Sequence, residues 1–161
     1  MRRLLIIWHS RTGGSRQMAE AAAEGAGAEI ETCLMRAAAV GAEDMISADG
    51  YIFAAPENLA AVAGEMKEFF DRTYYDVLGR IEGRPYAQMV CAGSDGENTV
   101  RQIARIATGW RLKEAQPPII ICTHAQTKIE ILSAKALKEV DLARCRELGQ
   151  AMGAGLAMGV F

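Results

Sequence analysis

The feature that most constrains this chain is an apolar run near its start that ends in a small polar turn. The run is Leu4–His9 and the turn is Ser10–Ser15, which contains three hydroxyl residues and two glycines. An uninterrupted apolar run of this length is typical of a strand covered on both faces, as in a parallel sheet. The residues that follow, Gln17–Glu24, are strong helix formers. The sequence therefore predicts a strand, a turn and a helix whose positively polarised amino end would attract a phosphate.

Length and composition limit the classes of protein to consider. The 161 residues predict a single domain over 1–161; half of them are apolar, 24% are charged, and the net charge is −2. No basic run occurs beyond Arg2-Arg3, so we expect no nucleic-acid partner. No apolar stretch fits a signal peptide or a membrane span, so we expect a cytoplasmic protein with no membrane association. The four cysteines are widely spaced and there are only two histidines, so we expect no metal site.

Apolar and helical patterns alternate along the rest of the chain. The expected later strands are Ala28–Leu34, Tyr51–Ala55 (ending at Pro56), Tyr86–Ala92 and Ile119–Cys122. The expected helices are Ser15 to Gly25 or Gly27, Ala63–Tyr75, Thr99–Thr108, and Leu142 to about Met158, with Asp141 as cap. Shorter elements are expected at Ala42–Ile46 and within Trp110–Ala115, and His124–Lys138 has no clear pattern. This alternation predicts an α/β fold with parallel strands and right-handed crossovers.

Two stretches resemble a known family. Ser10-x-Thr12-Gly13-x-Ser15 matches the phosphate loop of flavodoxin-like proteins. The second stretch, Pro56–Arg72, is similar to a segment of flavodoxin-like NAD(P)H:quinone oxidoreductases and NADPH-dependent FMN reductases. The matching residues there are Pro56, Gly64, Met66, Lys67, Phe69, Asp71 and Arg72. The resemblance fades after Gly109 and implies a three-layer αβα sandwich with a five-stranded parallel sheet in the order 2-1-3-4-5, and FMN as cofactor.

Three loops should converge at the carboxyl edge of such a sheet. They are Ser10–Ser15, Pro56–Ala63 and Gly93–Asn98. The resemblance implies that the hydroxyls of the first loop donate to the FMN phosphate while its glycines let the backbone approach. The expected cofactor-binding residues are Ser10, Arg11, Thr12, Gly13, Gly14, Ser15, Pro56, Glu57, Asn58, Leu59, Ala60, Gly93, Ser94, Asp95 and Gly96. The alternatives are a plain turn with Ser15 as helix N-cap, and a third loop in which Asp95 or Asn98 only caps a helix.

The second loop departs from the family pattern. Many related quinone reductases have Thr-Arg-aromatic-Gly after the proline, whereas this chain has Glu57–Ala60, and neither this loop nor Gly93–Asn98 contains an aromatic residue. A flavin ring without an aromatic partner leaves a face open for a nicotinamide or a quinone, or else marks a weak site. Glu57 would place a carboxylate near the ring and disfavour an anionic reduced flavin. No side chain is expected to be catalytic; His124 is a candidate proton donor over the site, and the alternative is a plain loop histidine.

The resemblance implies an FMN-binding oxidoreductase with NAD(P)H as electron donor and a quinone or similar small molecule as acceptor. One alternative is a one-electron carrier, which the weak acidity and the missing aromatics disfavour. Another is a non-catalytic flavodoxin-like protein with weak or no flavin binding. The last stretch, Leu148–Phe161, is almost entirely apolar, so it either packs on the sheet or is covered in a homo-oligomer, and we expect self-association.

Overall fold

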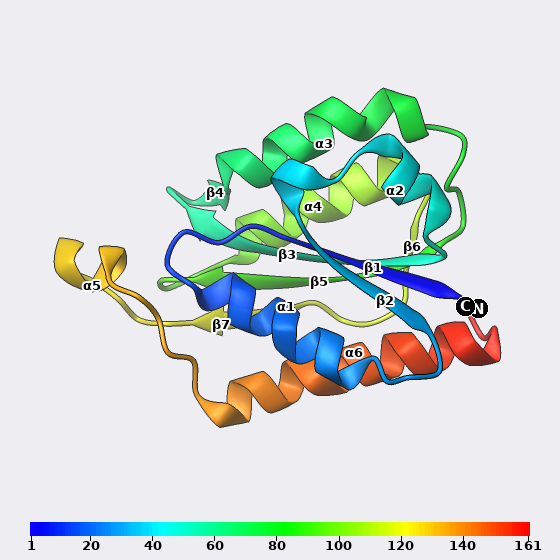
Figure 1. Ribbon diagram of the computed structural model, residues 1–161. Helices are drawn as coiled ribbons and strands as arrows, with labels where there is room; N and C mark the ends of the chain where they lie inside the picture. Colours follow the sequence, from blue (N-terminus) through cyan, green and yellow to red (C-terminus); the bar gives the residue numbers. More distant parts are fainter.

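A parallel sheet forms the centre of the computed structural model, which describes residues 1–161 (Figure 1). Its strands are β1 (Arg3–Trp8), β2 (Glu31–Arg36), β3 (Gly50–Asn58), β5 (Pro85–Ala92), β6 (Lys113–Glu114) and β7 (Ile119–Cys122). The order is β2-β1-β3-β5, and both β6 and β7 pair in parallel with the remaining edge of β5. The predicted order 2-1-3-4-5 is therefore confirmed, with a fifth strand that is interrupted where Pro117 and Pro118 lack backbone donors.

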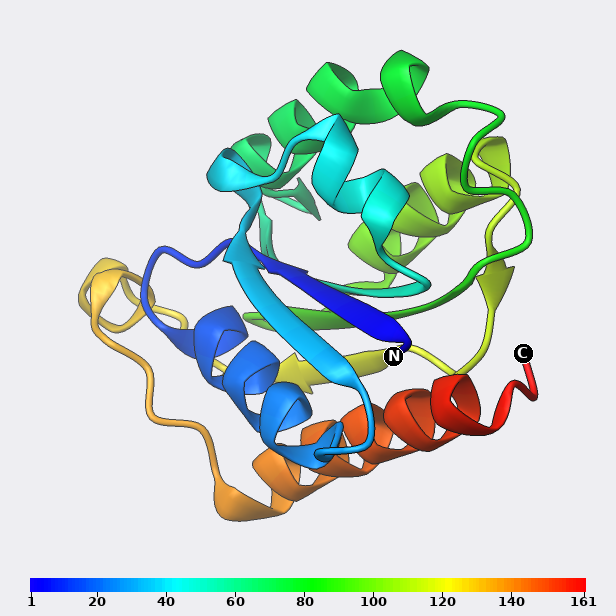
Figure 2. The same cartoon turned by 45° about the vertical axis from the view of Figure 1, so that its right-hand side comes forward.

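Helices cover both faces of the sheet and complete the predicted αβα sandwich. Figures 1 and 2 show α1 (Gly14–Gly25) and α6 (Glu139–Met158) on one face. The other face carries α2 (Ala42–Ser47), α3 (Gly64–Val77) and α4 (Glu97–Gly109), with a short 3-10 helix, η1 (Ala37–Ala39), beside them. Side chains of β1 alternate between the two cores, since Leu4 and Ile6 pack with α1 and α6 while Leu5 and Ile7 pack on the opposite side. No helix has the length and apolar character that crossing a bilayer requires.

Two strand boundaries differ from the sequence-based expectation. β2 begins at Glu31 rather than at Ala28, because Gly27 adopts a positive φ of 82° and Ile30 is buried in the core before the edge strand begins. β3 does not end at Pro56 but continues to Asn58 and folds back into β4 (Ala61–Val62). The Pro56 carbonyl accepts a hydrogen bond from Ala63 N, so the proline remains in the sheet although it donates nothing.

The last helix also begins earlier than expected. α6 begins at Glu139 with Lys138 at the N-cap position, so the prediction that Asp141 caps it is wrong; Asp141 lies in the first turn, 3.5 Å from Arg144. The small residues of this helix serve close packing on α1, because a Cβ at Gly149 would collide with the Ala22 carbonyl. Past this contact Met158, Val160 and Phe161 are exposed, and self-association through them stays a prediction.

Candidate functional site

The turn after β1 is braced by its own side chains. Gly13 takes a left-handed conformation (φ 97°) and is the residue that precedes α1, so the alternative with Ser15 as N-cap is wrong. The Ser10 hydroxyl accepts a hydrogen bond from Gly13 N at 2.9 Å. Gly14, the first residue of α1, lies close to Cys91: a Cβ added to Gly14 would be 2.5 Å from the Cys91 Sγ. The first backbone N–H groups of α1 are therefore left without helical partners at the carboxyl edge of the sheet.

Ser15 is the most informative residue of this turn. Its side chain is 1% exposed, and its Oγ finds no hydrogen-bond partner in the protein. A buried hydroxyl without a partner costs free energy, so such groups in folded proteins usually have a role. Ser15 lines a cavity together with Ser10, Arg11 and Thr12 at the amino end of α1.

Residues of all three predicted loops line the cavity. Its volume is about 130 Å³, well below the roughly 300–1,000 Å³ of pockets that enclose drug-sized ligands. A ligand as large as a flavin would therefore keep only one end in the enclosed part. The lining residues are Ser10, Arg11, Thr12, Gly14, Ser15, Pro56, Glu57, Asn58, Cys91, Ala92, Gly93, Thr123, Ala125, Ile131, Leu132 and Lys135. None of them is aromatic, as the sequence of the two later loops predicts.

Six of the predicted residues do not line this cavity: Gly13, Leu59, Ala60, Ser94, Asp95 and Gly96. Leu59 and Ala60 form the two-residue tip of the β3–β4 hairpin with φ of 52° and 62°, and the Leu59 side chain is fully exposed. Asp95 accepts a hydrogen bond from Glu97 N, so it closes the turn into α4. The third loop thus contributes only Gly93 to the cavity wall.

Glu57 has a structural role that the sequence pattern does not indicate. Its carboxylate accepts hydrogen bonds from Gly96 N at 2.9 Å and from the Thr99 hydroxyl and N–H at 3.0 and 3.3 Å. Glu57, near the end of β3, therefore caps the amino end of α4. A negative charge is favourable at the amino end of a helix. Asn98 does not cap α4 either, because its side-chain amide donates to the Ala60 carbonyl. The Glu57 carboxylate thus accepts three hydrogen bonds from the start of α4, while the residue also lines the cavity.

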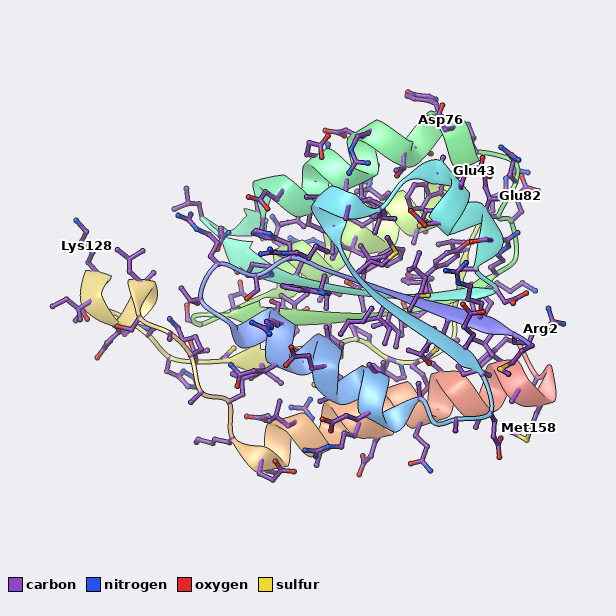
Figure 3. The ribbon with its side chains drawn as sticks, viewed as in Figure 1. Arg2, Glu43, Asp76, Glu82, Lys128 and Met158 are labelled. Atoms are coloured by element: carbon purple, nitrogen blue, oxygen red, sulfur yellow. The ribbon has the colours of Figure 1, made fainter.

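The segment Thr123–Leu137, which we call the strap, closes the outer side of the cavity and was not predicted. It contains α5 (Lys128–Leu132) and contributes Ile131, Leu132 and Lys135 to the wall. Figure 3 shows Lys128 on α5 pointing away from the sheet. The one sequence signal for this helix is the pair Thr127 and Glu130, which forms a capping box.

Gln17 holds the strap against the phosphate turn. Its side-chain amide donates to the Lys135 carbonyl at 2.7 Å and to the Gly13 carbonyl at 2.9 Å, and its oxygen accepts from Leu137 N at 3.0 Å. The Lys135 N–H donates to the Thr12 carbonyl at 2.8 Å. The strap and the turn therefore form one hydrogen-bonded unit.

The remaining titratable candidates do not supply a catalytic group. Burial raises the pKa of the Cys91 thiol to about 11, so it is a neutral part of the cavity floor at neutral pH. His9 lies outside the cavity and pairs through Nδ1 with Glu65 at 2.9 Å. His124 is in the strap but does not line the cavity, so a role as proton donor there has no geometric support.

Comparisons with known proteins agree with this architecture. Residues 36–124 match the model of the family described as NADPH-dependent FMN reductase. A flavodoxin from Aquifex aeolicus (strain VF5) is 38% identical over 88 residues, which are 52% of this chain and 46% of that protein. The chain thus spans about half the length of this curated relative.

Solved structures share the fold across nearly the whole chain. A flavodoxin from the domain Archaea has a TM-score of 0.77 at 16% identity, covering 96% of this chain and 98% of its own. A flavodoxin, WrbA-like protein from Agrobacterium tumefaciens has a TM-score of 0.71 at 18% identity, covering 99% of both chains. The family match and the fold together show that this chain is a flavodoxin-like member of the NADPH-dependent FMN reductase family.

Proposed function

We propose that the protein binds FMN with its phosphate at the Ser10–Ser15 turn and transfers electrons from NAD(P)H to a quinone or a similar small molecule. The observation that carries this proposal is the buried, unpartnered Ser15 hydroxyl at the amino end of α1. Membership of the reductase family supports the same reading.

The residues of the turn fit a phosphate. Helix amino ends attract anions through free N–H groups and the helix dipole, and Ser15 and Thr12 add hydroxyl donors at the cavity wall. The Ser10 hydroxyl already accepts from Gly13 N and still has its own proton to donate. Charge-assisted hydrogen bonds of this kind are stronger than neutral ones, so most of the affinity should come from the phosphate.

FMN, when bound, supplies the hydride and electron chemistry, and the protein provides orientation and access. The wall formed by Ile131, Leu132 and Asn58 is aliphatic or polar, so no aromatic ring of the cavity wall competes with a second planar molecule for the flavin. Electron donor and acceptor could therefore use the same open face in turn. This arrangement favours an oxidoreductase over a one-electron carrier.

The test is a titration of the flavin-free protein with FMN and with riboflavin, followed by flavin fluorescence. Thr12→Val removes one donor and keeps the side-chain shape, so FMN affinity should fall about tenfold or more, from the roughly 1.5–3 kcal/mol of a hydrogen bond to a charged group. Thr108→Val is the matched control, because the Thr108 hydroxyl bonds only within α4.

Equal affinity for the two flavins would refute the phosphate role of the turn. Oxidation of NADPH or NADH by the FMN-loaded protein with a quinone then separates an enzyme from a carrier. A loaded protein that oxidises neither nucleotide would leave the carrier as the better description, and a protein that takes up no flavin would leave the non-catalytic alternative.

A further inference from the structure

Four large aliphatic side chains are exposed at the carboxyl edge of the sheet, on two sides of the cavity. Leu59 at the tip of the β3–β4 hairpin is fully exposed, and Ile129, Ile131 and Leu132 on α5 are 80%, 50% and 58% exposed. Ile131 and Leu132 also line the cavity, as does Asn58 beside Leu59. Figure 1 shows α5 and β4 at the same side of the molecule. We call the four aliphatic residues the apolar rim.

The hairpin holds its part of the rim in a strained conformation. Leu59 and Ala60 both have a positive φ, of 52° and 62°, in a two-residue turn of the kind that usually contains Asn-Gly. Strain of this type costs free energy and is found mostly at functional sites. The Asn98 side-chain amide donates to the Ala60 carbonyl at 2.6 Å, so the tip that carries Leu59 is fixed in place.

The helix α5 is equally well ordered. Thr127 and Glu130 form its capping box, and the Lys135 ammonium donates to three carbonyls at its carboxyl end, at 2.6, 2.8 and 2.9 Å. Gln17 fixes the rest of the strap on the phosphate turn. Two ordered elements thus hold large aliphatic side chains in water, and a clustered apolar surface of this kind marks an interaction site.

The surroundings of α5 are positively charged. Residues 123–138 contain three lysines and one acid, whereas the whole chain has a net charge of −2. The acid, Glu130, accepts hydrogen bonds from two backbone N–H groups of its own capping turn. The side chains of Lys128 and Lys138 are exposed and make no hydrogen bond or ion pair, and Figure 3 shows Lys128 pointing away from the body of the molecule. Aliphatic side chains next to free lysines are suited to an anionic lipid surface.

We propose that the apolar rim and these lysines dock the protein on an anionic membrane, with the rim in the headgroup region of the bilayer. Ile131 and Leu132 belong to both the rim and the cavity wall, so the docked cavity faces the lipid. Docking itself needs no flavin. The further consequence, that the electron acceptor is a lipid-soluble molecule, rests on the proposed function.

This proposal departs from the expectation that the protein has no membrane association. That expectation depends on the absence of a signal peptide and of a spanning stretch, and no helix is long and apolar enough to cross a bilayer. The rim is assembled only in the fold, from Leu59 and from three residues about seventy positions later in the chain. A pattern of neighbouring residues therefore does not indicate it.

Other occupants fit the rim less well. A two-fold dimer would place the same surface on itself, and would set Lys128 and Lys138 of one protomer against those of its partner. Like charges that face each other oppose association. A small acceptor in the cavity would not account for the whole rim either, because Leu59 and Ile129 do not line the cavity.

The test is co-sedimentation of the flavin-free protein with two kinds of lipid vesicle, phosphatidylcholine alone and an equal mixture with phosphatidylglycerol. The anionic vesicles should bind the protein at least about tenfold more strongly, and this binding should fall at least about fivefold when salt is raised from about 0.1 to 0.5 M. Ile129→Ser should weaken it at least about fivefold, because an apolar side chain no longer leaves water. Lys128→Gln should weaken it about fivefold.

Two matched controls lie at the opposite edge of the sheet. Tyr75 is 80% exposed, like Ile129, but lies near the end of α3, which Figure 1 shows on the far side from α5. Lys113 is an exposed lysine on β6, which pairs with the first residues of β5. Tyr75→Ser and Lys113→Gln should leave vesicle binding unchanged. Ile129→Ser should keep the parent's Tm and FMN affinity, since the side chain is exposed and does not line the cavity.

Three results would overturn the proposal. The first is a parent protein that does not sediment with anionic vesicles. The second is vesicle binding that Ile129→Ser leaves unchanged, since charge alone would then hold the protein. The third is a dimer, seen by light scattering, that Ile129→Ser converts to monomers without any vesicle binding, which would assign the rim to a second copy of the chain. A protein that binds vesicles but takes up no FMN would refute the proposed function and leave the docking intact.

Discussion

Replacing Ser15 by alanine should weaken FMN binding without destabilising the fold. The Ser15 hydroxyl is 1% exposed and has no partner, and a buried unsatisfied polar group costs about 1–3 kcal/mol. Alanine removes that cost and is also the better helix former at this position in the first turn of α1. The free energy of unfolding should therefore stay the same or rise by up to about 3 kcal/mol, which corresponds to roughly 2–4 °C in Tm for each kcal/mol.

The FMN affinity of the same variant should move in the opposite direction. Loss of one hydrogen bond to a phosphate costs about 1.5–3 kcal/mol, or a rise in Kd of roughly 10- to 100-fold. Urea unfolding followed by circular dichroism measures stability, and a fluorescence titration with FMN measures affinity. Opposite signs are the signature of a hydroxyl that serves a ligand rather than the fold.

Thr32→Val provides the matched control. The Thr32 hydroxyl is also buried without a partner, but it lies on β2 and does not line the cavity. Its removal should raise stability in the same way and leave FMN affinity unchanged. If Ser15→Ala is less stable than the parent by more than about 1 kcal/mol and still binds FMN normally, the hydroxyl braces the turn and our reading of the site is wrong.

Three further changes test the attachment of the strap, the packing of α6 on α1 and the protonation of His9. Gln17→Ala removes two hydrogen bonds to the strap, worth about 1–3 kcal/mol together, so limited proteolysis within the strap should accelerate at least about fivefold; an unchanged cleavage rate would mean that other contacts hold the strap. Gly149→Ala should destabilise the fold by about 3 kcal/mol or more, because its Cβ meets the Ala22 carbonyl. Urea unfolding measures this, with Gly64→Ala, which meets no atom within 4 Å, as the nearly neutral control. Burial lowers the pKa of His9 from 6.5 despite the attraction of Glu65. The unfolded state therefore takes up the proton first, stability should fall as the pH drops below about 6.5, and a His9→Gln variant measured at several pH values should lack that part of the decline.

The sequence predicts those parts of the fold that depend on neighbouring residues. The apolar run of β1 and the hydroxyl and glycine residues of Ser10–Ser15 are local patterns, and the strand, turn and helix that they predict are all present. The strand order follows from the alternation of elements and from the position of the phosphate turn. These predictions need no knowledge of which distant residues meet.

The errors come from residues whose partners are distant in the sequence. Glu57 lines the cavity, but its three hydrogen-bond donors belong to the start of α4, about forty positions away, and no local pattern indicates them. Pro56 predicts the end of a strand. Instead, the chain continues in β3, turns back into β4, and the Ala63 N–H donates to the Pro56 carbonyl. In both cases the local sequence gives no information about the hydrogen-bond partner, and the partner decides the role of the residue.

The strap shows the same limit at the site itself. Its polar and aliphatic residues have no clear periodicity, and it is ordered by Gln17, from which the hydrogen-bonded Lys135 is 118 positions distant. The match to the reductase family ends at residue 124, so nearly all of the strap, like the phosphate turn, lies outside the matched stretch. The family match therefore covers the central strands of the site but neither the phosphate turn nor nearly all of the strap. The comparison with the family therefore does not report on Ser15 and Gln17, which precede the matched stretch, or on Leu132, which follows it, and their effects on FMN affinity must be measured on this protein.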